Sequence, residues 1–229
     1  MVHQKTKSRS VKVNGTAIRY TNKPITSWGG LTVILGSFFE KIDFKAWVKS
    51  NVPIQERSNN SKGIYEKVLA TFLTVLSGGE RFSHVMWWNS GMAAIKPVFA
   101  VDWLSKAAST LSRFWNKISR QSLSEKLFQN GRNLATEILE WEGISEGTLN
   151  FDSSVLTRYG EQDGAKKGYN PKEKGRGLHH PLLAFLSSGY IVNLWNRSGD
   201  TSSGQGVKEF LIQRLHILGE SIKVERVFM

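Results

Sequence analysis

The chain has 229 residues, enough for one large or two small domains, and its 40% hydrophobic and 22% charged residues are ordinary for a globular protein. Its 31 lysines and arginines against 19 acidic residues give a net charge of +12. That surplus favours nucleic acid over an anionic membrane surface, because the charge is not gathered on one amphipathic helix. The chain contains no cysteine, which excludes disulfides and thiolate zinc sites, and it has no apolar run of about 18 residues that would cross a membrane.

Positive charge is concentrated at the start of the chain. The first acidic residue is Glu40, and six basic residues precede it: Lys5, Lys7, Arg9, Lys12, Arg19 and Lys23. Residues 1–30 are therefore expected to form a flexible basic arm, with no signal-peptide core behind it. Such an arm is either a solvated tail or a contact for phosphate groups, and both alternatives stay open.

Residues 31–145 have the apolar spacing of helices. A series at intervals of three and four residues runs from Tyr65 to Leu76, and the same spacing predicts helices over residues 105–118 and 122–141. Gly143 is the expected C-cap of the last of these helices. This part of the chain is thus predicted to be all-α.

One helical segment has features of a DNA-recognition helix. Residues 103–118 could form the second half of a helix-turn-helix, with polar residues on the outer face: Ser109, Ser112, Arg113 and Asn116. The spacing suits a helix that enters the major groove, and Arg113 is the candidate DNA contact. Many unrelated helices have the same pattern, so its specificity is low.

The pattern changes from helices to strands near residue 145. Alternation and turn residues predict, in chain order, a strand over 148–157, a basic Gly-rich stretch over 158–177, strands over 182–186 and 190–196, a helix over 206–218 and a strand over 223–229. The order strand, strand, strand, helix, strand is the opening of a ribonuclease-H-like fold, although other α/β folds share it. The predicted fold is therefore an all-α region followed by the first half of an α/β domain.

Asp152 is the principal candidate for chemistry. It lies inside the first predicted strand, on the face opposite Leu149 and Phe151. Propensity disfavours a carboxylate in mid-strand, and such a residue persists when it is solvated, paired with a cation or bound to a metal. A salt bridge or solvent exposure is the commoner case, and a metal ligand is the alternative that would matter for function.

A cluster of basic residues follows this strand. The Gly-rich stretch contains six candidate phosphate contacts: Arg158, Lys166, Lys167, Lys172, Lys174 and Arg176. Contacts of this kind supply most non-specific affinity for DNA, and a solvated hairpin loop is the alternative. His179 and His180, just before the next strand, could contact DNA or a metal, but structural or surface histidines are the commoner case.

An ordered series of motifs resembles the DDE transposases of bacterial insertion sequences. The motifs are FDSSVLTRYG at 151–160, GAKKGYNP at 164–171, GRGLHHPLLAF at 175–185 and RSGDTSSG at 197–204. In that family three acidic residues hold Mg²⁺ or Mn²⁺, and Asp152 matches the first of them. The resemblance implies that the second carboxylate follows the last predicted strand and that the third, a glutamate, lies on a later helix. This chain is then expected to be an N-terminal fragment that binds no metal tightly and does not cut DNA alone.

The resemblance also implies an organisation and partners. Residues 1–30 would be the basic arm, 31–145 a helical DNA-binding and dimerisation region, and 146–229 the start of the catalytic domain. The expected partners are terminal inverted repeats and target DNA, with a homodimer on DNA and a location on the bacterial nucleoid in the cytoplasm. An inactive DNA-binding remnant or inhibitor of transposition is the alternative within the family, and a basic scaffold or RNA-binding protein is the alternative outside it.

Overall fold

The computed structural model describes residues 10–13, 16–19, 27–56, 63–218 and 222–228. The chain divides into two compact units, Met1–Phe128 and Gln129–Met229, and the division lies within a helix. Both helices and strands are present, so the chain is a mixed α/β protein. None of the described helices is both long enough and apolar enough to cross a membrane.

The first unit begins with a hairpin that the sequence did not predict. Strands β1 (Ser10–Val13) and β2 (Thr16–Arg19) pair antiparallel, with Ser10 opposite Arg19. Lys12 and Arg19 of the predicted basic arm therefore lie in strands. The other basic residues of that arm lie outside the described residues.

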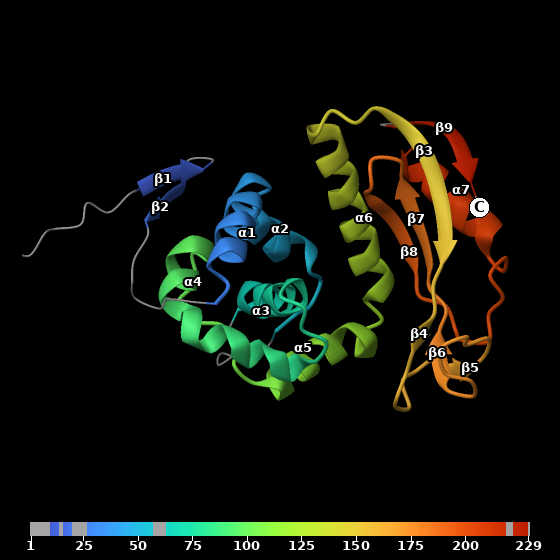
Figure 1. Cartoon of the computed structure of the whole chain (residues 1–229), viewed down its shortest axis with the longest axis horizontal. Coiled ribbons are helices and arrows are strands. Elements are labelled where there is room, and N and C mark those ends of the chain that lie inside the picture. Colours follow the sequence, from blue (N-terminus) through green and yellow to red (C-terminus); the bar gives the residue numbers. More distant parts are fainter. Residues whose placement is uncertain (1–9, 14–15, 20–26, 57–62, 219–221, 229) are drawn as a thin grey trace, which may run out of the picture. The chain divides into compact units, whose positions relative to one another are not determined.

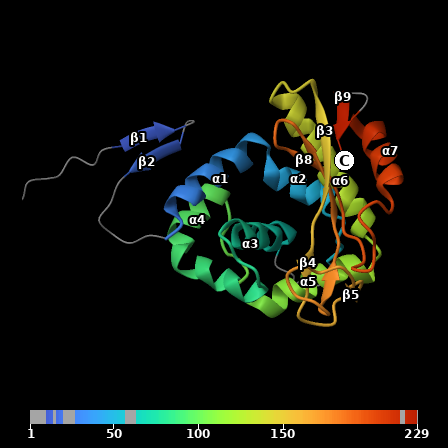
Figure 2. The same cartoon turned by 45° about the vertical axis from the view of Figure 1, so that its right-hand side comes forward.

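The other regular elements of the first unit's described residues are helices. They are α1 (Gly29–Lys41), α2 (Phe44–Asn51), α3 (Ile64–Leu76), the 3-10 helix η1 (Phe82–Gly91), α4 (Met92–Phe99), α5 (Ala108–Arg120) and the start of α6 (Ser124–Trp141). In both views α3 lies among α1, α2, α4 and α5 (Figure 1 and Figure 2). The predicted helical series on α3 is confirmed for Tyr65, Val68, Leu69 and Leu73, which are buried, whereas Phe72 and Leu76 remain partly exposed.

Tyr65 gives the first unit a predicted dependence on pH. Its hydroxyl donates to the Phe99 carbonyl at 3.1 Å, and burial, followed by the nearby Glu66, raises the pKa of Tyr65 to about 12. A phenol whose pKa is raised by folding stabilises the protein below its unfolded pKa of about 10, and this contribution disappears as the pH rises to 12.

We therefore expect the wild-type protein to lose about 2–3 kcal/mol more stability between pH 9 and 12 than the Tyr65→Phe variant loses. Urea unfolding of both proteins across that range measures the difference. The variant lacks one hydrogen bond, so its curve starts about 1 kcal/mol lower and is flatter. Parallel curves would show that ionisation of Tyr65 is not coupled to folding.

The second unit contains a four-stranded mixed sheet among its described residues. Strands β3 (Glu146–Ser153), β7 (Leu182–Leu186), β8 (Ile191–Trp195) and β9 (Lys223–Phe228) have the order β8-β7-β3-β9. β7 is antiparallel to both β3 and β8, whereas β9 is parallel to β3. Helix α7 (Val207–Leu218) connects β8 at one edge to β9 at the other (Figure 1).

The core of this unit lies on one face of the sheet. Leu149 and alternate residues of β7 pack there against Leu139 of α6 and Phe210 of α7. Phe210 is fully buried and meets Phe151 and Trp195 edge to face, at centroid distances of 5.5 and 5.2 Å. Gly143 follows α6 with a φ of +71°, so the predicted glycine C-cap is confirmed.

Two predicted elements differ from the structure. The strand expected over 148–157 ends at Ser153, and β4 (Leu156–Thr157) pairs instead with β6 (Gly177–His179). β5 (Lys166–Lys167) joins β6 to complete a small sheet of order β4-β6-β5, where the sequence predicted a loop. α7 begins at Val207, after a turn whose last residue, Gly206, has a φ of +77°.

Candidate functional site

Asp152 lies one residue before the end of β3 and is exposed. Because Leu149 and Phe151 contribute to the core, strand alternation places Asn150 and Asp152 on the other face of the sheet. In the described part of the chain, the structure records neither a hydrogen bond nor an ion pair of the Asp152 carboxylate. Its oxygens are therefore open to a ligand from outside.

β9, which pairs with β3, ends on the same side of the sheet as the C-terminal end of β3. β9 runs parallel to β3, and Phe228 lies opposite Asn150 in the ladder. The ends of both strands thus converge near Asp152. Among the described residues no group of three or more His, Cys, Asp or Glu could hold a metal, so Asp152 alone offers one monodentate or bidentate contact to a hard cation.

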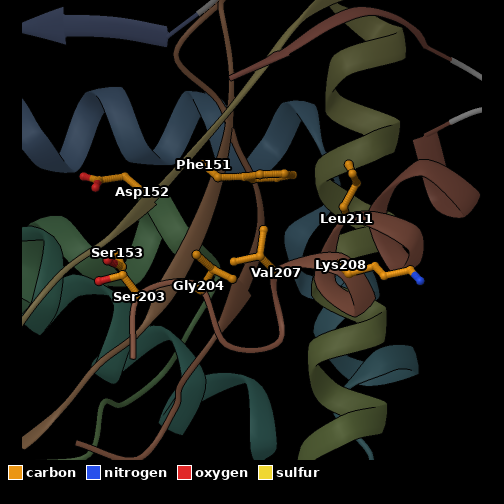
Figure 3. Close-up of a pocket in the computed structure, with 9 residues that line it drawn as sticks. Phe151, Asp152, Ser153, Ser203, Gly204, Val207, Lys208 and Leu211 are labelled. Atoms are coloured by element: carbon orange, nitrogen blue, oxygen red, sulfur yellow. The ribbon is translucent and has the colours of Figure 1, made fainter. Parts of the chain in front are cut away.

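A cavity of about 700 Å³ adjoins Asp152. Apolar side chains form most of its wall, from Phe151, Leu182, Val207 and Leu211. Ser153, Ser203 and Lys208 also line it. Figure 3 shows the Asp152 carboxylate directed away from Phe151 and Leu211. The carboxylate therefore lies at the rim of the cavity rather than inside it.

A buried arginine fixes one wall of this cavity. The guanidinium of Arg197 donates from Nε to the His180 carbonyl at 2.9 Å and from Nη1 to the Gln205 carbonyl at 2.6 Å. Nη1 also lies 3.3 Å from the carbonyls of Ser202 and Ser203. Burial lowers the pKa of Arg197. Nothing in the sequence indicated this role beyond the position of Arg197 at the start of the RSGDTSSG motif.

The two adjacent histidines have structural partners. His179 accepts from Arg158 Nε at Nδ1 over 2.9 Å, and its Nε2 lies 2.8 Å from the Asp163 carbonyl, which requires the proton on Nε2. His180 Nδ1 lies 2.7 Å from the Thr201 carbonyl. Both side chains are buried. The structure thus favours the structural interpretation over contact with DNA or a metal.

The predicted DNA contacts of the second unit fall on the small sheet and its loops. Lys167, Lys172 and Lys174 are exposed, and the structure records no ion pair for them within the described residues. Lys166 lies 3.1 Å from Asp200, and the nearby Ser198 hydroxyl and the Lys166 ammonium lower the pKa of that carboxyl.

The other three predicted DNA contacts, Arg176, Arg158 and Arg113, differ in how exposed they are and in their partners. Arg176 lies 3.6 Å from Glu173, with both side chains partly exposed. Arg158 is half-buried against His179. Arg113 belongs to the first unit, where it is exposed on α5 and its Nε donates to the Ser109 carbonyl at 3.1 Å.

Together these features define a mixed α/β protein with an exposed carboxylate near the C-terminal end of an interior strand of a mixed sheet and a basic segment after that strand. No family model, no curated protein and no solved structure matches the chain. Any functional assignment therefore depends on the residues themselves and on the topology of the sheet.

Proposed function

We propose that the chain belongs to a DDE-type DNA transposase of a bacterial insertion sequence and that Asp152 is the first of its metal-binding carboxylates. The observation that carries the proposal is the position of Asp152 at the end of β3 in a sheet of order β8-β7-β3-β9. On this proposal the second unit belongs to a ribonuclease-H-like catalytic domain. The helices of the first unit would serve DNA-end recognition and dimer contacts.

The topology supports this assignment. A ribonuclease-H-like sheet has its first strand in the middle, antiparallel to the second and parallel to the fourth, with a helix between the third and fourth. Taken in chain order, β3, β7, β8 and β9 have this arrangement, with α7 before β9. Four strands can be arranged in a sheet in many orders and directions. Agreement in both spatial order and strand direction is therefore more specific than the order of elements along the chain.

The environment of Asp152 suits a metal ligand. An exposed carboxylate that forms no ion pair with any described residue keeps its oxygens for Mg²⁺ or Mn²⁺, which prefer such ligands. In the resembling family the second carboxylate follows the fourth strand, and β9, the matching strand here, lies parallel to β3 with Phe228 opposite Asn150. A pair of bound cations would activate the attacking oxygen and stabilise the leaving oxygen of a phosphodiester.

The charge of the chain supports DNA as the partner. The net charge is +12, and exposed lysines occupy the segment that follows the Asp152 strand. Phosphate contacts from such side chains supply affinity that falls as the salt concentration rises. Binding of terminal repeats and target DNA, and association with the bacterial nucleoid, are parts of this proposal.

Binding of Mn²⁺ observed by NMR tests the role of Asp152. We expect millimolar Mn²⁺ to broaden the amide signals of Phe151, Asp152 and Ser153 in the wild-type protein, because the paramagnetic ion relaxes nearby nuclei. Asp152→Asn should remove this broadening, since the amide lacks the charge that holds a hard cation. Asp163→Asn, which changes an exposed carboxylate of the same unit, is the matched control and should leave it intact.

Equal broadening in the wild-type protein and the Asp152→Asn variant would contradict the proposed site. DNA binding without any Mn²⁺ effect at Asp152 would instead favour an inactive DNA-binding remnant. In a preparation that cleaves DNA with Mg²⁺, Asp152→Asn is expected to abolish strand cleavage.

A further inference from the structure

Two tyrosines of the segment 158–177 have unusually exposed side chains. Tyr159 is 72% exposed and Tyr169 is 80% exposed. The hydroxyl of Tyr159 donates to Glu173, and the Arg176 guanidinium lies 5.5 Å from the centroid of its ring. The structure records no such partner for the ring of Tyr169 within the described residues. Tyr169 therefore presents a free aromatic face to solvent.

The backbone that carries Tyr169 is held firmly on both sides. The next residue, Asn170, is only 4% exposed; its amide donates to Thr157 Oγ1 at 3.0 Å. Asn170 Oδ1 also accepts from the backbone nitrogens of Lys172 and Glu173, at 3.1 and 2.9 Å. On the other side, a Cβ at Gly168 would lie 1.8 Å from the Gly199 carbonyl oxygen, so the two backbones touch.

This anchoring distinguishes Tyr169 from an aromatic residue at a loose loop tip. Because the backbone on both sides of Tyr169 is already fixed, covering its ring with a ligand costs little further backbone entropy. Exposed cations lie on both sides of it in sequence, because Lys167 precedes it and Lys172 and Lys174 follow it. The segment thus combines an exposed aromatic ring on a fixed backbone with exposed positive charges.

A ligand that fits this combination has a flat π-face and regularly spaced negative charges. An unpaired DNA strand has both, since its bases can stack on aromatic rings while its phosphates meet lysines. In duplex DNA the base faces are covered by their neighbours. Lysines alone would not distinguish single-stranded from duplex DNA, whereas an exposed aromatic ring that stacks on an unpaired base does.

We propose that Tyr169 stacks on an unpaired base of a DNA strand whose phosphates contact Lys167, Lys172 and Lys174. The inference rests on the proposed function for its partner, and it adds a preference for unpaired or frayed DNA over intact duplex. The small sheet β4-β6-β5, which follows β3 and Asp152 in the chain, then binds a single DNA strand that has separated from its duplex.

Fluorescence anisotropy with a labelled oligothymidine and a duplex of equal length tests the proposal with the full chain. Tyr169→Ala should weaken binding of the single strand by about 5- to 150-fold, the range found for loss of one stacked base. Binding of the duplex should change little. Tyr169→Phe keeps the ring and should retain the affinity of the wild-type protein.

The dependence on salt separates stacking from charge. Tyr169→Ala should lower the affinity at every salt concentration without changing the slope of log affinity against log salt. A Lys172→Ala/Lys174→Ala double variant should reduce that slope by about 1.4, because each phosphate contact on a single strand contributes about 0.7. Tyr190→Ala, which removes another exposed tyrosine of the second unit, is the matched control and should bind as the wild type does.

The outcomes distinguish this inference from the proposed function. Salt-dependent binding of DNA that Tyr169→Ala leaves unchanged would overturn the stacking role and leave DNA as the partner. A wild-type protein that binds neither the single strand nor the duplex would overturn both. Tighter binding of oligouridine than of oligothymidine would overturn the assignment to DNA, because only the former carries the 2′-hydroxyl.

Discussion

Replacing Phe210 with alanine is expected to destabilise the second unit by about 3–5 kcal/mol, the usual cost of removing a buried phenylalanine. Phe210 is fully buried on α7 and contacts Phe151 of β3 and Trp195 of β8. The substitution would leave a cavity between the helix and two strands of the sheet. Because the free energy of unfolding of a small domain is only about 5–15 kcal/mol, such a loss removes a large part of it.

Hydrogen exchange of the full chain in increasing urea measures this effect in the second unit separately. We expect amides of β3 and β7 in the Phe210→Ala variant to exchange through an opening that is easier by about 3–5 kcal/mol. Ile212→Ala on the same helix is the control, because Ile212 is more than half exposed and should change little. Protection in the Phe210→Ala variant equal to that of the wild type would contradict the assigned packing of α7 on the sheet.

The main strands of the second unit could be predicted because their signal is local. The strand over 182–186 matches β7, and the strand over 190–196 contains β8, since hydrophobic residues bounded by turn residues mark both. The expected position of Asp152 on the face opposite Leu149 and Phe151 also agrees with β3, because alternation depends on neighbours along the chain.

Elements fixed by distant partners could not be predicted. β4 and β5 have two residues each, and only their pairing with β6 makes them strands. Arg197 gives the same difficulty, since its role depends on carbonyl groups that the fold brings to it. Arg214 of α7 is a second example, because it is buried although it is charged. Its burial and the nearby Arg132 lower its pKa to about 10. Periodicity carries no information on such contacts.

A buried ion pair of the first unit shows the same limit most clearly. Lys67 lies on the buried face of α3, inside a run that the sequence marks as apolar. Its Nζ lies 2.6 and 2.7 Å from the two carboxylate oxygens of Glu56, and Lys117 Nζ lies 3.1 Å from Oε1 of the same carboxylate. The side chains of Lys67 and Glu56 are less than one-tenth exposed. Glu56 therefore allows a lysine to occupy a position in the core.

Glu56→Gln is expected to destabilise the first unit by about 3–5 kcal/mol, because it leaves the buried ammonium of Lys67 without its counter-charge. Urea unfolding, with hydrogen exchange of α3 to locate the change, measures the loss. Glu40→Gln, at an exposed carboxylate of α1, is the control and should stay within about 0.5 kcal/mol of the wild type.

A double variant tests the cause of that loss. Glu56→Gln/Lys67→Met removes both charges of the pair and should recover most of the stability, because an apolar side chain of similar length needs no counter-charge in the core. If the double variant is as unstable as Glu56→Gln alone, the loss comes from packing or from the contact with Lys117. Recovery in the double variant would show that position 67 tolerates an apolar residue and that the glutamate is needed because of the lysine.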